Sequence, residues 1–166
     1  MTGPRRSREP KHPLDCHERA LRLLAVRPRS RRELQTRLLQ AGFEAQEVAD
    51  ELARLDAVGL VNDVEFARAV VEHQLTARRA GRRAVASALA AKGVDRGTID
   101  ATLEEFGGSD AERAEELARA RAPRLSGLPP DRAYARLVSF LIRRGHDPET
   151  ARVASRRALK VVAGEE

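Results

Sequence analysis

The sequence is poor in the residues that form disulfides, aromatic cores and membrane spans. It has one cysteine, Cys16, no tryptophan and only 3% aromatic residues in a chain of 166. A single cysteine excludes an internal disulfide. No apolar run approaches the roughly 18 residues of a membrane span, and the N-terminus lacks the apolar segment of a secretory signal. These absences predict a cytoplasmic protein without a membrane segment.

The sequence also lacks the spacings typical of catalytic and metal sites. Cys16 and His17 are neighbours, but neighbouring helical residues point about 100° apart and make a poor nucleophile–base pair. Cys-x-x-Cys and His-x-x-x-His spacings are missing, as is a phosphate-binding G-x-x-x-x-G-K-[ST] loop. We therefore expect no catalytic activity, no cofactor and no metal. His73 and His146 are expected at the surface or at helix ends rather than as ligands.

Basic residues outnumber acidic ones by 31 to 25, which gives a net charge of +6 and a sequence pI of about 10.5. This balance favours acidic partners such as nucleic acid. Residues 1–13 combine four cations with three prolines and almost nothing apolar. They are predicted to form a disordered basic tail, either idle in solvent or in non-specific contact with phosphate.

One short pattern occurs three times and organises the rest of the chain. In each copy a leucine precedes a glycine by four residues and an acidic residue follows the glycine by two. The copies are Leu38–Glu44, Leu89–Asp95 and Leu141–Asp147, with their glycines 51 and 52 residues apart. A period of about fifty residues indicates a tandem array of one structural unit.

The pattern around each glycine predicts a helix, a turn and a second helix. A glycine after apolar residues at i, i+4 is typical of the C′ position, where the backbone turns left-handed at low cost. Apolar residues spaced by four and three follow the turn and predict one face of a helix. These residues are Val48, Leu52 and Leu55, then Ile99, Leu103 and Phe106, and in the atypical last copy Ala151, Ser155 and Ala158.

Helix-start signals complete the fold prediction. The predicted N-caps are Asp15, Ser30, Asn62, Ser109 and Asp147. No stretch alternates with the period of two that a half-buried strand requires. The chain is therefore predicted to be all-α, an elongated array of three tandem three-helix repeats with about nine helices. The predicted repeats span residues 14–59, 60–107 and 108–163, after the tail at 1–13.

The run from about Leu14 to Leu159 resembles the RecX family, cytoplasmic bacterial proteins that regulate the RecA recombinase. Three stretches carry the resemblance: Ser30–Leu34 leading to Gly42-Phe43, Gly59–Asp63 leading to Phe66-Ala67, and the basic break around Gly81 leading to Lys92–Asp95. The sequence departs from the family pattern at Asn62, where an acid is common, and at Arg79, where another glycine is frequent.

The resemblance implies a non-enzymatic regulator. RecX proteins bind RecA filaments on single-stranded DNA, suppress their ATP hydrolysis and strand exchange, and promote filament disassembly. By this resemblance the partners are the RecA filament and single-stranded DNA, with double-stranded DNA as a second candidate ligand. We expect the protein to act as a monomer.

Arginines gather at the starts of the second helices, at the break and on the last helix, whereas the helices after Gly42 and Gly93 are acidic. If the repeats stack in register, these arginines line up as one basic track; a merely solvated face is the alternative. The candidate contact residues are Arg29, Arg31, Arg32, Arg37, Arg78, Arg79, Arg82, Arg83, Arg143, Arg144, Arg152 and Arg156.

Other modes of DNA binding fit the sequence less well. In a helix-turn-helix reader the second helix enters the major groove, but the helices that follow Gly42 and Gly93 would bring carboxylates toward phosphates. Binding of single strands by stacking bases on aromatic side chains is also disfavoured. The chain has only five aromatic residues, and four of them are expected on core faces or in the turn. The alternative function that stays open is a general DNA-binding helical array acting through the basic track.

The turn assignment predicts that Gly42→Val destabilises the protein. A β-branched residue with positive φ costs about 1 kcal/mol or more. The free energy of unfolding, measured by chemical denaturation, is expected to fall by that amount. An unchanged value would contradict the turn at Gly42.

Overall fold

The computed structural model describes residues 14–163, and the predicted tail at 1–13 lies outside the described residues. Within them the chain forms nine α-helices and no strand, which confirms the all-α prediction. The helices are α1 (Cys16–Val26), α2 (Arg31–Gln40), α3 (Ala45–Ala57), α4 (Asp63–Glu72), α5 (Arg82–Ala91), α6 (Arg96–Glu105), α7 (Asp110–Arg121), α8 (Pro130–Arg143) and α9 (Pro148–Ala163). A π-helical turn, His73–Ala77, extends α4, and a 3₁₀ turn, Ala122–Leu125, extends α7.

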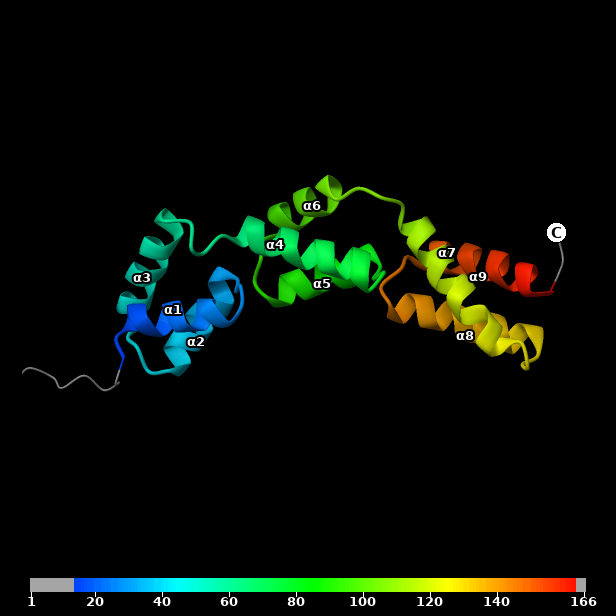
Figure 1. Ribbon diagram of the computed structural model, residues 1–166, viewed down its shortest axis with the longest axis horizontal. Coiled ribbons are helices and arrows are strands. Elements are labelled where there is room, and N and C mark those ends of the chain that lie inside the picture. Colours follow the sequence, from blue (N-terminus) through cyan, green and yellow to red (C-terminus); the bar gives the residue numbers. More distant parts are fainter. Residues whose placement is uncertain (1–13, 164–166) are drawn as a thin grey trace, which may run out of the picture. The chain divides into compact units, whose positions relative to one another are not determined.

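The chain divides into two compact units, and the boundary falls inside α4, the helix labelled in Figure 1. Unit 1 ends at Phe66 and contains α1, α2 and α3. Unit 2 begins at Ala67 and contains α5 to α9. The repeat boundaries expected near residues 59 and 107 stay predictions, because the division by contacts does not coincide with them.

All three repeat glycines end a helix in the left-handed conformation, as predicted. Their φ values are 94° at Gly42, 80° at Gly93 and 87° at Gly145. At the first turn the Gly42 N–H donates to the Leu39 carbonyl (2.9 Å) and the Phe43 N–H to the Leu38 carbonyl (3.3 Å). The same two bonds recur at the other two glycines. This pair of bonds defines a Schellman motif, which satisfies carbonyl groups left open at the helix end.

The predicted helix starts are confirmed at the caps where the side-chain bond is described. Asp15, Ser30 and Ser109 each accept a hydrogen bond from the backbone N–H three residues on. Asn62 does the same for Glu65, at 3.2 Å. Such caps replace hydrogen bonds that the first turn of a helix cannot make internally. The local sequence therefore sets where these helices begin.

In unit 1 the apolar faces of α1, α2 and α3 enclose one core. Leu34 and Leu38 of α2 and Val48 and Leu55 of α3 are completely buried there. Ala20 of α1 packs against them. The trio predicted after Gly42 thus faces inward, and its burial contributes about 1.5–3 kcal/mol for each large side chain.

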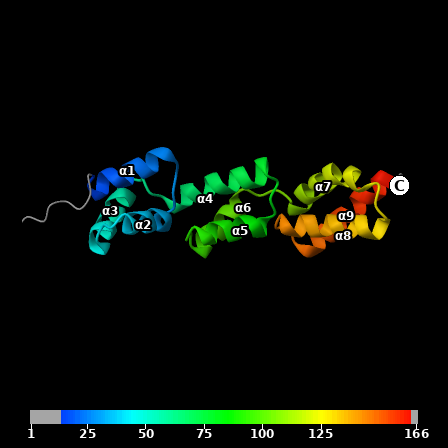
Figure 2. The ribbon, with the colours of Figure 1, turned by 90° about the horizontal axis from the view of Figure 1, so that it is seen from below.

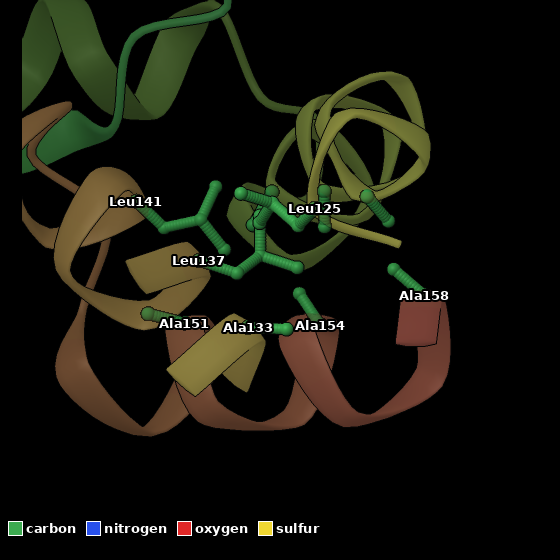
Figure 3. Packing of buried hydrophobic residues seen from close by; sticks show 10 residues of the cluster. Leu125, Ala133, Leu137, Leu141, Ala151, Ala154 and Ala158 are labelled. Atoms are coloured by element: carbon green, nitrogen blue, oxygen red, sulfur yellow. The ribbon is translucent and has the colours of Figure 1, made fainter. Parts of the chain in front are cut away.

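In unit 2 the last three helices form a bundle whose core is built largely from alanine (Figures 2 and 3). Leu137 and Leu141 of α8 lie against Ala151, Ala154 and Ala158 of α9 (Figure 3). The separation of two packed helices depends on the side chains at their contact, so small residues let the axes approach closely. The weak pattern of the third copy is therefore a change of core packing, because its small residues are buried.

Two backbones meet in unit 2 where the break before α5 approaches the turn between α8 and α9. The Gly81 N–H donates to the Arg144 carbonyl, at 2.9 Å. A Cβ atom on Gly81 would lie 2.1 Å from the carbonyl carbon of Gly145, and one on Gly145 would lie 2.2 Å from the Cβ of Ala84. Neither position can hold a side chain without moving backbone. Gly145 is thus both a helix terminator and a contact surface.

His146, directly after that turn, is buried with 1% exposure. It lies at a helix end, which is one of the two positions expected for it. Its Nδ1 lies 3.2 Å from Oδ1 of Asp110, and its Nε2 lies 3.2 Å from the Arg79 carbonyl. The ring, just before α9, therefore contacts both the start of α7 and the break before α5. We call the contacts of Gly81, Asp110, Gly145 and His146 the joint of unit 2.

Asp110 is the charged centre of this joint. Burial raises the pKa of its carboxyl group, but the hydrogen bond and charge of His146, the Arg82 N–H and the charge of Arg113 outweigh burial and lower the pKa overall. The carboxylate is therefore ionised at neutral pH, where it can accept both the His146 ring and the Arg82 N–H (3.3 Å).

Gly81→Ala is expected to loosen the joint. A methyl group at 2.1 Å from backbone atoms forces the break away from the α8–α9 turn, and overpacking of this kind costs about 1–3 kcal/mol. The matched control is Gly127→Ala, since nothing lies within 4 Å of a Cβ there. Denaturant unfolding should show a lower midpoint for Gly81→Ala alone, and equal midpoints would contradict the close approach.

Candidate basic interface

The twelve candidate arginines fall into both units. Unit 1 holds Arg29, Arg31, Arg32 and Arg37, and unit 2 holds the other eight. The single track through all three repeats stays a prediction. Within each unit, however, the contacts separate arginines that hold the fold together from arginines whose guanidinium groups are available to a partner.

Arg29 holds the fold of unit 1. It is 8% exposed, its Nε donates to the Leu23 carbonyl (3.0 Å) and its Nη1 to Oε1 of Glu33 (2.7 Å). Removing either contact would leave a buried group unpaired, which is costly. We therefore remove Arg29 from the candidate contact residues.

Arg31 and Arg82 occupy equivalent positions and make equivalent contacts. Each is the first residue of its helix, and its N–H donates to an aspartate that opens a later helix: Arg31 to Asp63 at 2.8 Å, Arg82 to Asp110 at 3.3 Å. Each side chain also donates to a carbonyl 21 residues on, in the helix that follows the turn glycine. The acceptors are the Leu52 carbonyl, at 3.4 Å, and the Leu103 carbonyl, at 2.8 Å.

This recurring arrangement, which we call the arginine clamp, ties three elements together through one residue. The Leu103 carbonyl lies in the last turn of α6, where carbonyl groups lack helical partners. Arg82 satisfies it from outside the helix. The side chain of a clamp arginine is half-exposed, but one of its N–H groups donates to a carbonyl of the same unit.

The joint brings the basic break beside the end of α8. Nη1 of Arg144 donates to the Arg78 carbonyl, at 3.2 Å. Arg79 has a φ of 46° and its Nε donates to Oε2 of Glu116, at 2.7 Å. Arg78 and Arg83 are exposed, and neither has an ion pair within the described part of the chain. Two of the predicted groups, the break and the end of α8, thus form one basic surface in unit 2.

On α9 the predicted stripe is exposed but partly neutralised. Arg152 pairs with Glu149, at 2.8 Å, and Arg157 pairs with Glu115 of α7. Arg156 is exposed and has no ion pair among residues 14–160. Exposed pairs of this kind contribute little to stability. Because Arg152 is paired with an acidic side chain and Arg156 is not, Arg156 is the candidate contact residue that remains on α9.

The arginines with neither an ion pair nor a side-chain hydrogen bond to described residues are the candidates that survive, which leaves out Arg82 and Arg144. In unit 1 they are Arg32 and Arg37, and in unit 2 they are Arg78, Arg83, Arg143 and Arg156. Sequence reasoning missed three further exposed arginines on the helices of the unit 2 bundle: Arg121 of α7, and Arg132 and Arg136 of α8. The helical spacing of Arg132, Arg136 and Arg143 is visible in the sequence and would have found two of them.

Cys16 and His17, which could in principle act as a nucleophile and a base, make structural contacts instead. Burial, with the charges of Glu47, Glu51 and Asp15, raises the pKa of the Cys16 thiol to about 11, so it is protonated and a poor nucleophile at neutral pH. The neighbouring His17 turns away to Glu51, with Nδ1 2.7 Å from Oε1. Among the described residues, no group of three or more His, Cys, Asp or Glu side chains could hold a metal ion.

No helix in the described part of the chain has the length and apolar character needed to cross a membrane. What the geometry defines is a helical repeat protein with exposed arginines on both units.

Comparison with known proteins gives the class a family. Residues 16–55 match the model of the first three-helix domain of RecX, and residues 62–103 match the second. The regulatory protein RecX of Mycobacterium sp. strain KMS is 37% identical over 155 residues, 90% of this chain and 85% of that protein. RecX of Streptomyces coelicolor is 36% identical over 167 residues, 96% and 87% of the two chains.

Solved structures agree on the fold. The crystal structure of RecX from Lactobacillus salivarius superposes with a TM-score of 0.77 at 19% identity, covering 86% of this chain and 94% of the other. A second RecX crystal structure gives 0.73 at 22% identity, covering 81% and 67%. The chain belongs to the RecX family of regulatory proteins.

The division between clamp and available arginines is tested by substituting two neighbours. Arg82→Gln removes the bond to the Leu103 carbonyl and is expected to lower the free energy of unfolding by about 1 kcal/mol. Arg83→Gln should leave that free energy within about 0.5 kcal/mol. Instead it should weaken binding to single-stranded DNA and reduce its salt dependence. Equal effects of the two variants on stability would contradict the clamp.

Proposed function

We propose that this protein binds the RecA–single-stranded-DNA filament and inhibits its ATP hydrolysis, strand exchange and filament growth. The observation that carries the proposal is membership of the RecX family over almost the whole chain. The protein acts in the cytoplasm as a monomer and performs no chemistry itself. Its effect on ATP turnover passes entirely through the recombinase.

The charge distribution supports a filament as the partner. The available arginines lie on both units, on α2 and at the break, α8 and α9. A filament offers phosphates and protein surface together, repeated at regular intervals, so several weak contacts can be made at once. Linked contacts of this kind bind more tightly than each would alone.

Available arginines on both units allow the protein to contact the filament at more than one point. A regulator that occupies the filament at several points affects more than one recombinase subunit. Substoichiometric amounts then suffice, because ATP turnover in the filament depends on cooperative assembly. A general DNA-binding array, in contrast, acts only by competing for DNA.

The proposal is tested by titrating the protein into the single-strand-DNA-dependent ATPase of the cognate RecA, with DNA in excess and at two salt concentrations. We expect inhibition far below one protein per recombinase, and we expect it to survive the higher salt. An effect that begins only when the DNA is saturated, and that salt abolishes, would favour the general DNA-binding array.

A matched pair of variants locates the surface in the same assay. Arg78→Gln combined with Arg83→Gln removes two available charges from the break, and Arg22→Gln combined with Arg96→Gln removes two exposed charges elsewhere. The first pair should require a higher concentration for half inhibition, whereas the second should behave like the unmodified protein. Equal behaviour would exclude the break as a contact surface.

A further inference from the structure

One surface hollow in unit 2 is lined by several arginines. It lies between the end of α7 and the outer face of α8, and three of its seven lining residues are arginines. Arg121 comes from α7, and Arg136 and Arg143 come from α8, with the hydroxyl group of Ser139 between them. The lining contains no carboxylate. We call this hollow the α8 arginine pocket.

The arginines of the pocket are uncommitted. Neither Arg136 nor Arg143 has an ion pair or a hydrogen-bond acceptor for its side chain among the described residues. Arg119, two residues before Arg121 on α7, shows the contrast, since its Nη2 donates to Oε2 of Glu115 at 3.0 Å. Like charges placed together without counter-charges repel one another, and this repulsion is relieved when an anion binds between them.

Phe140 gives the pocket a preorganised wall. The Cζ atoms of Arg121 and Arg144 each lie 5.5 Å from the centroid of its ring. Guanidinium groups at this distance are attracted to the ring quadrupole. Their planes are thereby restrained before a ligand arrives, which lowers the entropy lost on binding. Arg121 is exposed, so its hydrogen-bond donors remain accessible.

The pocket continues along α8 as a line of positive charge. Arg132, Arg136, Ser139 and Arg143 fall within an arc of about 60° on the helix. The helix has one acidic residue, Asp131, about 100° around from Arg132. Arg136 and Arg143 are separated along the axis by about 10.5 Å. A ligand that matches the line carries several anionic groups in a row.

We propose that the α8 arginine pocket and its line bind the phosphodiester backbone of a nucleic-acid strand, with Arg121, Arg136 and Arg143 as the contact residues. Guanidinium groups bind phosphate oxygens with paired, charge-assisted hydrogen bonds, and Ser139 adds a neutral donor. A polynucleotide supplies regularly spaced anions, whereas an acidic protein segment supplies them irregularly. The regular line on one helix face therefore favours the polynucleotide.

This site deepens the proposed function, because the strand in the filament would be its natural ligand. It does not depend on that function, since free DNA must also bind. The site lies wholly within unit 2 and uses residues absent from the predicted track except Arg143. It assigns direct DNA contact to the bundle of α7, α8 and α9.

The test measures binding of the full chain to a fluorescein-labelled single-stranded oligothymidylate by anisotropy, at several salt concentrations. Arg136→Gln combined with Arg143→Gln should weaken binding by about tenfold and reduce the slope of log K against log salt by about 1.4, the value for two lost phosphate contacts. The control combines Arg19→Gln with Arg96→Gln, which removes the same charge from exposed positions on α1 and α6. It should change affinity by less than about twofold.

Two further variants and ligands make the result decisive. Arg136→Lys combined with Arg143→Lys keeps the charge and loses the paired donors, so the salt slope should persist while affinity falls several-fold. A duplex of the same length shows whether single or double strands are the better source of the phosphodiester. Thermal unfolding of each variant should match the unmodified protein, because the substituted side chains are exposed.

Three outcomes would overturn the proposal. Equal losses for the pocket variant and its control would mean that only net charge matters. Unchanged DNA affinity together with lost binding of a polyglutamate peptide would assign the pocket to an acidic protein segment. An unchanged salt slope in the glutamine variant would exclude phosphate contacts. If DNA binding fails in the pocket variant but the unmodified protein never inhibits RecA, the pocket stands and the proposed function fails.

Discussion

The carboxylate of Asp110 is the single group on which the architecture of unit 2 depends most. It accepts the first N–H of α5 and the ring of His146, and it lies 3.5 Å from Nη2 of Arg113. The partners come from three helices or turns, and all of them favour the ionised form. The close approach of Gly81 and Gly145 then follows, since the two backbones are held beside a common charge. Without this anchor, α5 and the α8–α9 turn would share only one direct backbone bond.

The same logic recurs in unit 1 with fewer partners. Asp63 accepts the first N–H of α2, and Arg31 repeats the geometry of Arg82. A clamp arginine therefore has a double role: its backbone opens a helix, and its side chain closes another. An arginine is suited to this because its long stem reaches a distant carbonyl while its charge stays partly hydrated. High arginine content is thus a structural resource here as well as a means of binding anions.

The elements set by local chemistry could be predicted from the sequence. The glycine turns and N-caps depend on neighbours within six residues, and these were predicted at the right residues. The apolar trios depend on helical spacing and were predicted correctly except for Phe106, which is the half-buried C-cap residue of α6. The roles of single arginines depend on partners far along the chain. Arg29 and Arg83 look alike in sequence, yet one is buried against Glu33 and the other is exposed. The burial of His146 could not be predicted for the same reason, because its acceptors are 36 and 67 residues away.

The glycine at position 81 also limits how this architecture can evolve. Ser30 occupies the corresponding position of the first repeat, twelve residues before its turn glycine, and its side chain caps α2. A serine cannot accept the backbone approach that Gly81 makes to Gly145. If the first repeat replaced the second, the α8–α9 turn would therefore lose its close backbone contact with the residue before α5. The repeats share one pattern, but the first cannot replace the second because Gly81 and Ser30 make different contacts.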